Sequence, residues 1–154
     1  MTPQETAHHV GAGMMANDHA SIAMGMRLIH ISPGAAHMEM RVTHGMVNGF
    51  GTCHGGMITT LADSAFGFAC NSYNELTVAS GLSVDFVAPA FEADLLTARA
   101  SEVSLSGRTG VYDVVVFNQN ADCIAVFRGR SYRIKGKQTV PLDDKLLVDN
   151  QAHV

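Results

Sequence analysis

The chain has 154 residues, of which 47% are hydrophobic and 16% are charged, and its formal net charge is −4. This length and composition fit one globular domain and exclude a disordered chain. The mild negative charge argues against nucleic acid as a partner, because proteins that bind a duplex usually carry a basic face.

The first residues, MTPQETAHHVGAGMM, lack a basic stretch followed by a continuous apolar one, so no secretory signal is predicted. No apolar run approaches the ~18 residues that span a bilayer, so we expect no membrane partner. The three cysteines, Cys53, Cys70 and Cys123, are odd in number and lack CxxC spacing. We interpret them as reduced thiols of a cytoplasmic protein.

Residues 1–25 are predicted to form a weakly helical N-terminal segment, rich in Ala, Met and His, with a break at Asn17-Asp18. Two strands are predicted after it, over residues 26–31 and 36–42. In the second strand the apolar residues alternate with polar ones, which is typical of a strand with one buried face. The alternating apolar residues are Ala36, Met38, Met40 and Val42.

One long helix is predicted over residues 54–71, and a helix of that length extends ~27 Å. Four strands are predicted beyond it, over residues 77–87, 94–105, 110–117 and 123–134. Residues 136–154 form a polar C-terminal tail. The order β-β-α-β-β-β-β has a single helix between strands, so an alternating parallel sheet is excluded and the helix must cover a long antiparallel sheet. We therefore predict an α+β hotdog fold over residues 26–135, in which an antiparallel β-sheet wraps around one long central helix.

The predicted helix carries an apolar stripe and a separate face of small residues. The stripe consists of Ile58, Leu61, Ala65 and Ala69. The small face consists of Gly56, Thr59, Thr60, Asp63, Gly67 and Cys70. Asp63 has no cation three or four residues away. A poorly hydrated carboxylate is costly unless it is paired, and chemistry is one reason to keep it. The helical pattern alone also permits a solvent-facing or structural aspartate.

His54-Gly55-Gly56 lies where the predicted helix begins. The first N–H groups of a helix lack partners within it and carry the positive end of the helix dipole. Two glycines there allow a carbonyl oxygen to approach these donors, which would stabilise a developing oxyanion. An ordinary glycine-rich turn into a helix has the same sequence pattern.

The spacing of Gly55 and Asp63 has a consequence for assembly. Eight positions along a helix correspond to ~12 Å, so one scissile carbonyl cannot lie within ~3 Å of both groups of the same chain. If both groups act on one thioester, two chains must contribute across a two-fold axis. The minimum active unit would then be a homodimer.

At these residues the sequence resembles the hotdog thioesterase superfamily, most closely the phenylacetic-acid-degradation (PaaI-type) thioesterases. The likeness covers about residues 15–135. Its motifs are Asn48-Gly49, Cys53-His54-Gly55-Gly56, Leu61-Ala62-Asp63-Ser64-Ala65-Phe66, Ala69-Cys70-Asn71-Ser72, Val84-Asp85-Phe86, Gly110-Val111-Tyr112-Asp113 and Val126-Phe127-Arg128-Gly129.

The resemblance implies that Asp63 is the catalytic carboxylate, as a general base toward water or as a nucleophile. It implies that Gly55 donates its N–H to the thioester oxygen, and that His54 and Asn48 shape and polarise the site. Ser64 stands where relatives often carry Thr and keeps a supporting hydroxyl. Gly56 would border the substrate beside Gly55.

Several basic and aromatic residues are candidates for substrate contacts. Arg108, Arg128 and Arg130 are candidates for the phosphates of coenzyme A, although charges that protect a strand edge fit the same pattern. Phe86 and the helix methionines are candidates for the acyl pocket, which core packing explains equally well. A Cys53-His54 hydrolase is disfavoured, because adjacent residues of an extended segment point opposite ways.

We therefore expect a thioester hydrolase that acts on phenylacetyl-CoA or ring-hydroxylated phenylacetyl-CoA in aromatic catabolism. Coenzyme A is part of the substrate, and neither a metal nor another cofactor is expected. The assembly would be a homodimer at least, with a homotetramer expected. The alternatives are a non-catalytic acyl-CoA sensor on the same scaffold and a hotdog dehydratase acting on a β-hydroxyacyl thioester.

Overall fold

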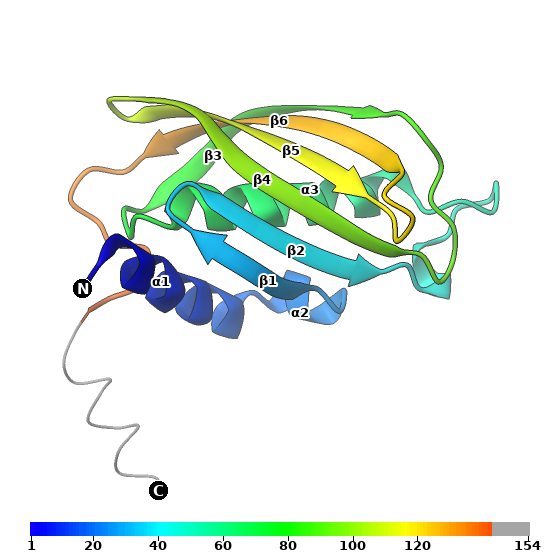
Figure 1. Cartoon of the computed structure of the whole chain (residues 1–154), viewed down its shortest axis with the longest axis horizontal. Coiled ribbons are helices and arrows are strands. Elements are labelled where there is room, and N and C mark those ends of the chain that lie inside the picture. The colour runs from blue at the N-terminus through cyan, green and yellow to red at the C-terminus, as the bar shows by residue number, and fades with distance from the viewer. Residues whose placement is uncertain (143–154) are drawn as a thin grey trace, which may run out of the picture.

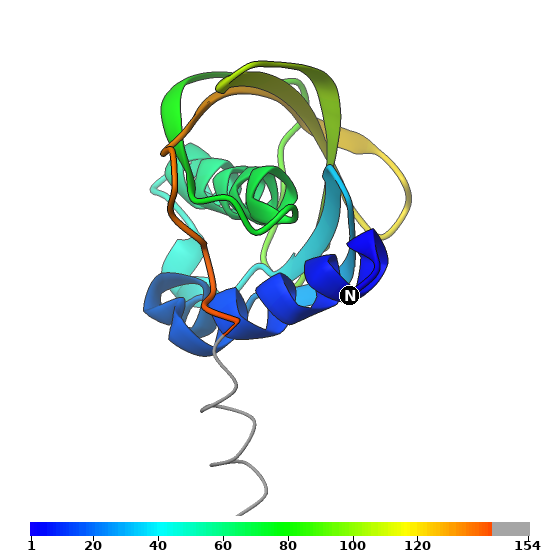
Figure 2. The same cartoon turned by 90° about the vertical axis from the view of Figure 1, so that its left-hand side faces the viewer.

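The computed structural model describes residues 1–142. Its elements are α1 (Pro3–Asn17), α2 (His19–Ala23), β1 (Arg27–Ser32), β2 (Ala35–Arg41), the short 3-10 helix η1 (His44–Met46), α3 (Gly55–Asn71), β3 (Thr77–Phe86), β4 (Leu95–Ser106), β5 (Thr109–Phe117) and β6 (Cys123–Arg133). The six strands form one antiparallel sheet in the order β1-β2-β4-β5-β6-β3. The sheet arches over α3, and α1 runs below that helix (Figure 1 and Figure 2). The predicted antiparallel sheet wrapped around one long helix is confirmed.

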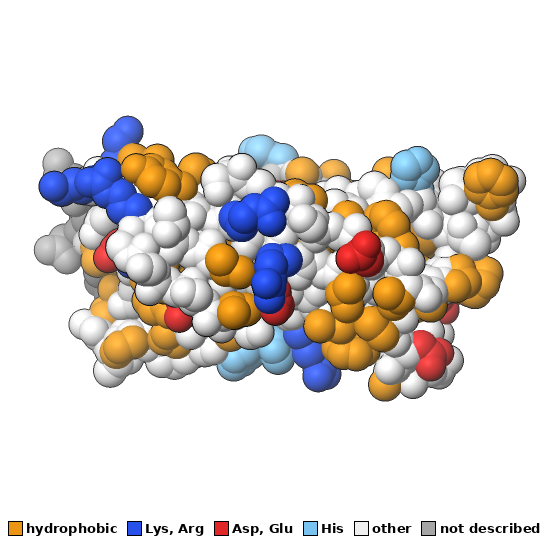
Figure 3. All heavy atoms as spheres, turned by 90° about the horizontal axis from the view of Figure 1, so that it is seen from above, with side chains coloured by type: hydrophobic (Ala, Val, Ile, Leu, Met, Phe, Trp, Pro, Cys, Tyr) orange, Lys and Arg blue, Asp and Glu red, His pale blue; other side chains and the backbone are white. Residues whose placement is uncertain are grey.

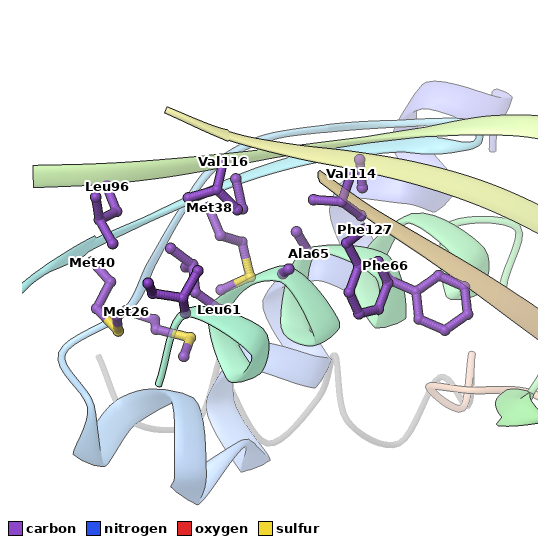
Figure 4. Close-up of a cluster of buried hydrophobic side chains, with 14 of the residues drawn as sticks. Met26, Met38, Met40, Leu61, Ala65, Phe66, Leu96, Val114, Val116 and Phe127 are labelled. Carbon is purple, nitrogen blue, oxygen red and sulfur yellow. The ribbon is translucent and has the colours of Figure 1, made fainter. Parts of the chain in front are cut away.

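The hydrophobic core lies between α3 and the concave face of the sheet (Figure 4). The predicted apolar stripe of α3 is buried in it, and so are the alternating residues of β2. The buried members are Ile58, Leu61, Ala65 and Ala69 of α3 and Ala36, Met38, Met40 and Val42 in and just after β2. Within residues 1–142, neither α3 nor any other helix is long and apolar enough to cross a membrane.

Gly129 of β6 is a point where the sheet comes close to α3. A Cβ atom at this position would lie 2.8 Å from ring carbons of Phe66, so only glycine fits without a shift. The Phe66 ring also packs against Tyr112 and Phe127, with ring centroids 5.6 Å and 5.9 Å apart. These contacts fix the height and rotation of α3 beneath the strands.

The N-terminal segment folds as two helices with the predicted break at Asp18. Thr2 and Glu5 form a capping box at the start of α1, in which each side chain accepts a hydrogen bond from the other's backbone N–H. Asp18 ends α1 and caps α2, because its Oδ1 accepts from the Ser21 N–H at 3.0 Å. Gly11 of α1 packs against the side chains of β1, so the segment covers one edge of the sheet.

Residues 137–141 begin the predicted C-terminal tail and run from the end of β6 toward α1. Asn74 binds the backbone of Val140 through two hydrogen bonds of 2.9 Å, and Thr139 donates to Asn71 at 2.7 Å. A Cβ atom on Gly13 of α1 would lie 2.6 Å from Val140. This segment therefore joins the end of α3 to α1. Residues 143–154, with Asp143 and Asp144, lie outside the described part of the chain.

Candidate active site

The start of α3 presents one free backbone donor. His54 is the N-cap, and its Nδ1 accepts from the Gly56 N–H at 3.0 Å, while its carbonyl accepts from the Met57 N–H at 2.9 Å. Among the described residues, none accepts a hydrogen bond from the Gly55 N–H. The donor predicted to hold an oxyanion is therefore available. Gly56, by contrast, directs its N–H to His54 and offers only the space left by its missing side chain.

The His54 hydrogen bond also determines the tautomer of the ring. A ring nitrogen that accepts carries no proton, so the neutral imidazole holds its proton on Nε2. His54 is exposed in the single chain, which leaves Nε2–H free to donate outward. The side chain thus shapes the helix start through one nitrogen and can polarise a bound carbonyl through the other.

Phe86, at the end of β3, lies directly against Gly55. A Cβ atom at Gly55 would lie 2.9 Å from Cζ of the Phe86 ring, so the glycine is needed for this contact. Both residues line a cavity of about 340 Å³, together with residues 87–90 and Ile58. The Phe86 side chain remains 51% exposed, which is unusual for an aromatic residue that has only a core role. The structure therefore brings an apolar wall to the free Gly55 N–H.

Asn48 organises the loop that precedes α3. Its Oδ1 accepts three hydrogen bonds, from the Phe50 N–H at 2.9 Å and from the Thr52 N–H and hydroxyl at 3.2 Å each. The loop is closed by the bridge between Val47 and Cys53. Asn48 thus holds the approach to His54 in place, and its amide N–H₂ group makes no hydrogen bond to the described residues.

Asp63 lies on the exposed face of α3, eight residues beyond Gly55. Among residues 1–142, no Lys, Arg or His forms an ion pair with it. Partial burial nevertheless raises the pKa of this carboxyl group above its ordinary value. One turn earlier, the Thr59 and Thr60 hydroxyls donate to the helix carbonyls of Gly55 and Gly56 at 2.8 Å. The Asp63 carboxylate therefore has no hydrogen-bond or ion-pair partner among the described residues.

Ser64 connects the candidate site to the N-terminal segment. Its hydroxyl lies 3.0 Å from the hydroxyl of Ser21 in α2, and Ser21 is 1% exposed. Residues 1–25 carry no motif that indicates a role at the site, so this contact was not predicted. The pattern Asp18-x-x-Ser21 signals the helix cap, but no local pattern indicates that Ser21 meets a residue 43 positions away.

The basic candidates separate into two places. Arg128 makes a bidentate ion pair with Asp113 of β5, in which Nε and Nη2 donate to the two carboxylate oxygens at 2.7 Å and 2.9 Å. These hydrogen bonds lower the pKa of Asp113. Arg130 lies over Gly81 of the neighbouring strand β3. Both side chains project from the outer face of the sheet, opposite α3, so the structure does not bring them to the Gly55 cavity.

Arg108 lies at the end of the molecule, on the β4–β5 turn. Its Nη1 donates to the Tyr132 hydroxyl at 3.3 Å, and it borders a pocket of about 650 Å³. The other cations lining this pocket are Arg133, Lys135 and Lys137. Glu75, which pairs with Arg133 at 2.9 Å, is the one carboxylate there among the described residues. Figure 3 shows Lys and Arg side chains gathered at one end of the molecule.

A cysteine–histidine mechanism and a metal-dependent mechanism have little support in the described residues. Cys53 is buried, burial raises the pKa of its thiol, and its Sγ donates to the His54 carbonyl at 3.7 Å rather than pairing with the imidazole ring. Within residues 1–142, no three His, Cys, Asp or Glu side chains lie close enough together to hold a metal ion. The candidate groups that remain for the chemistry are the Asp63 carboxylate and the Gly55 backbone N–H.

One antiparallel sheet curved around a central helix is the hotdog fold, and a free N–H and a carboxylate on that helix are groups that a hydrolase of this fold can use. The model of the Thioesterase superfamily matches residues 50–125. Acyl-coenzyme A thioesterase PaaI of Escherichia coli K12 is 44% identical over 126 residues, which cover 82% of this chain and 90% of that protein. The chain therefore belongs to the thioesterase superfamily and, within it, to the acyl-coenzyme A thioesterases of the PaaI type.

Solved structures agree with this assignment. The E. coli PaaI protein from the phenylacetic acid degradation operon superposes with a TM-score of 0.86 at 40% identity, over 88% of this chain and 99% of that one. The TT0310 protein of Thermus thermophilus superposes with a TM-score of 0.72 at 36% identity, over 75% and 97% of the two chains. The fold and the thioesterase activity predicted from the sequence are confirmed.

Proposed function

We propose that this thioesterase hydrolyses phenylacetyl-CoA or ring-hydroxylated phenylacetyl-CoA to the free acid and coenzyme A, in phenylacetate and aromatic catabolism. The 44% identity to E. coli PaaI over most of both chains carries the proposal. The cavity beside Gly55 supports it, because the exposed Phe86 ring offers an aromatic wall to an aryl group whose carbonyl points at the Gly55 N–H.

In the proposed reaction, the Gly55 N–H and His54 Nε2–H polarise the thioester carbonyl and stabilise the oxyanion. As a general base, Asp63 takes a proton from the water that attacks the carbonyl carbon and passes it to the departing thiolate as the C–S bond breaks. As a nucleophile, Asp63 attacks the carbonyl carbon itself and coenzyme A leaves as a thiolate; water then hydrolyses the mixed anhydride to the free acid and supplies the proton of the thiol. The raised pKa of Asp63 makes the carboxylate a stronger base than an ordinary aspartate.

The two halves of this site come from different chains in the proposal. Gly55 and Asp63 are ~12 Å apart along one helix axis, which is too far for one carbonyl. The sheet edge at β3 supports a paired arrangement, since within the described residues β3 pairs with β6 alone and exposes Val78, Leu82 and Phe86. We propose that two chains join at β3 and the exposed face of α3, and that two such dimers form a tetramer.

The nucleotide of coenzyme A is proposed to bind in the basic pocket that Arg108 lines. Its four cations face one carboxylate among the described residues, so the pocket has a net positive charge in an otherwise acidic protein. Arg128, predicted alongside Arg108, is already neutralised by Asp113. Phosphate groups are held best by guanidinium and ammonium groups that are not already paired.

The test is steady-state thiol release across a series of thioesters with wild-type protein and the Phe86→Ala variant. We expect kcat/KM to be highest for phenylacetyl-CoA and its hydroxylated forms, and lower by about 10-fold or more for straight-chain acyl-CoA of similar size. Phe86→Ala should reduce this preference by lowering the aromatic values selectively. Equal kcat/KM for aromatic and straight-chain thioesters in the wild type would exclude the proposed substrate.

A further inference from the structure

His30 and His37 lie side by side on the outer face of the sheet. They are partners in the antiparallel pairing of β1 with β2, and their ring centroids are 5.1 Å apart with the ring planes tilted by 47°. The residues before and after His37, Ala36 and Met38, are fully buried in the core, so the His37 side chain points away from it. The histidine pair therefore faces the side of the sheet opposite α3 and the Gly55 cavity.

Neither ring is bound to a carboxylate. His30 Nε2 lies 3.2 Å from the Ser32 hydroxyl, and the His37 ring makes no hydrogen bond to any described residue. The neighbouring Glu39 carboxylate on β2 is bound by Arg27 instead. The Nε2–H tautomer of His30 donates to Ser32 and keeps its lone pair on Nδ1. Each of the two rings therefore has a nitrogen lone pair that can bind a ligand.

Arg99 of β4 is the charged group next to this pair. It is the partner of His37 in the pairing of β2 with β4, and its guanidinium lies 5.6 Å from the centroid of the Phe117 ring. Among the described residues, no carboxylate forms an ion pair with Arg99. Burial, followed by the positive charges of His30 and Arg99, lowers the pKa of His37. The His37 ring is therefore neutral at pH 7, which is the form that binds metal ions.

The separation of the two ring centroids is the one that a shared metal ion requires. A metal–nitrogen bond to histidine is about 2.0–2.1 Å long, which puts the metal about 3.2 Å from the centre of each ring that it binds. Two rings at an angle of about 90–110° at the metal then have centres about 4.5–5.2 Å apart. The 5.1 Å between His30 and His37 lies within this range. Rotation about each Cβ–Cγ bond turns the nitrogens and leaves the ring centre almost in place, so neither strand has to move.

We propose that His30 and His37 form a surface site for a divalent transition metal ion, with water in the remaining coordination positions. Imidazole suits Cu²⁺, Ni²⁺ and Zn²⁺, whereas Mg²⁺ and Ca²⁺ prefer oxygen ligands. Two protein ligands are enough for such a site, and no cluster of three is present among residues 1–142. Cu²⁺ should bind more tightly than Ni²⁺ or Zn²⁺. The ion has no part in the proposed hydrolysis.

The experiment titrates the full chain, without a purification tag, with Ni²⁺ and with Cu²⁺ in a calorimeter. We expect one ion per chain in the wild type. His30→Ala and His37→Ala should each weaken binding by about 10-fold or more, because losing a ligand costs at least as much as losing a group that orients one. The double variant should bind no more weakly than either single variant, since one imidazole alone cannot chelate. Wild-type affinity in either single variant would overturn the proposal.

His44→Ala is the matched control, because it removes another exposed histidine. His44 Nδ1 lies 3.4 Å from a Glu92 carboxylate oxygen, so this pair also offers a nitrogen and an oxygen to a cation. The variant should bind metal as the wild type does. A loss of affinity in His44→Ala as large as that in His37→Ala would show that the ion is not held by the histidine pair of β1 and β2.

Arg99→Gln tests the sign of the ligand charge. Removing a neighbouring positive charge should strengthen binding of a cation by about threefold to tenfold at low salt and by less at high salt. Weaker metal binding in Arg99→Gln would contradict the proposal. These titrations measure binding and not hydrolysis, so the substrate proposed for the thioesterase stands or falls separately.

The Cu²⁺ form allows the two ligands to be identified directly. Its electron paramagnetic resonance spectrum should show coupling to two imidazole nitrogens in the wild type. His30→Ala and His37→Ala should each lose one of these couplings, and His44→Ala should keep both. A spectrum that is the same in the wild type and in the His37→Ala variant would place the ion elsewhere and overturn the proposal.

Discussion

The two halves of the candidate site differ in how much of their surroundings one chain supplies. At the start of α3, the His54 ring binds Gly56, the Asn48 loop is closed by three hydrogen bonds, and Phe86 lies against Gly55. In the middle of α3, Asp63 stands on a face that the chain leaves exposed. The proposed oxyanion half is thus built within one chain, whereas the described residues leave the proposed carboxylate half exposed, as the proposed homodimer requires.

The largest expected effect comes from changing the exposed half. Asp63→Asn keeps the shape of the side chain but removes its ability to take a proton or attack carbon, so kcat should fall by about 1,000-fold with KM nearly unchanged. Steady-state thiol release checks this. A fall confined to KM would place Asp63 in ground-state binding.

Mixing variants tests whether the two halves belong to different chains. Gly55→Ala places a Cβ atom 2.9 Å from the Phe86 ring and should displace the donor, lowering kcat by about 100-fold. In an equal mixture of Gly55→Ala and Asp63→Asn chains, half of the dimers are mixed and each has one intact site of two. Co-refolding should therefore restore about a quarter of wild-type activity. If both groups acted within one chain, the mixture would stay inactive.

A smaller effect is expected for the basic residues, where the substitutions of Arg108 and Arg128 should differ in their effect on KM. Arg108→Gln should raise KM for acyl-CoA by about 10-fold and weaken the salt dependence of kcat/KM, because Arg108 has no carboxylate partner among the described residues and lines the basic pocket. Arg128→Gln should change KM by less than about twofold, since Asp113 already binds that guanidinium. Equal effects of the two substitutions on KM would contradict the proposed nucleotide site.

The smallest expected effects are those of pH on kcat and on stability, through the Asp63 carboxyl group. Because the pKa of Asp63 is raised, kcat of the wild type should fall with decreasing pH through a value above that of an ordinary aspartate. The free energy of unfolding depends on pH in the opposite direction. The folded state holds the proton of the Asp63 carboxyl group more tightly than the unfolded state does, so stability is lost as pH rises through the raised pKa. Asp63→Asn should therefore melt slightly higher than wild type at pH 7 and equally at pH 3, as thermal unfolding can show.

Much of the fold was predictable because it follows from local patterns. The alternation in β2 and the apolar stripe of α3 each set which face is buried, and both predictions are confirmed by full burial. The break at Asp18 was predictable because a residue that caps a helix leaves a local signature. The free donor at Gly55 was predictable for the same reason, since every helix start has unpaired N–H groups.

The pairing of side chains was not predictable in this way. Arg128 and Arg108 look alike in the sequence, and only the register of β5 with β6 places Asp113 beside the first of them. The link from Ser21 to Ser64 spans 43 positions. Similarly, nothing near Thr139 or Val140 in the sequence indicates that they bind Asn71 and Asn74.

The sequence by itself determined the elements, the buried faces and the two chemical groups on α3, because each depends on residues within a few positions of one another. The tertiary structure decided which charges are paired, what touches Gly55 and how the N-terminal segment meets Ser64. Such contacts join residues far apart in the chain, and their geometry is set by packing of the whole sheet against one helix rather than by any local preference.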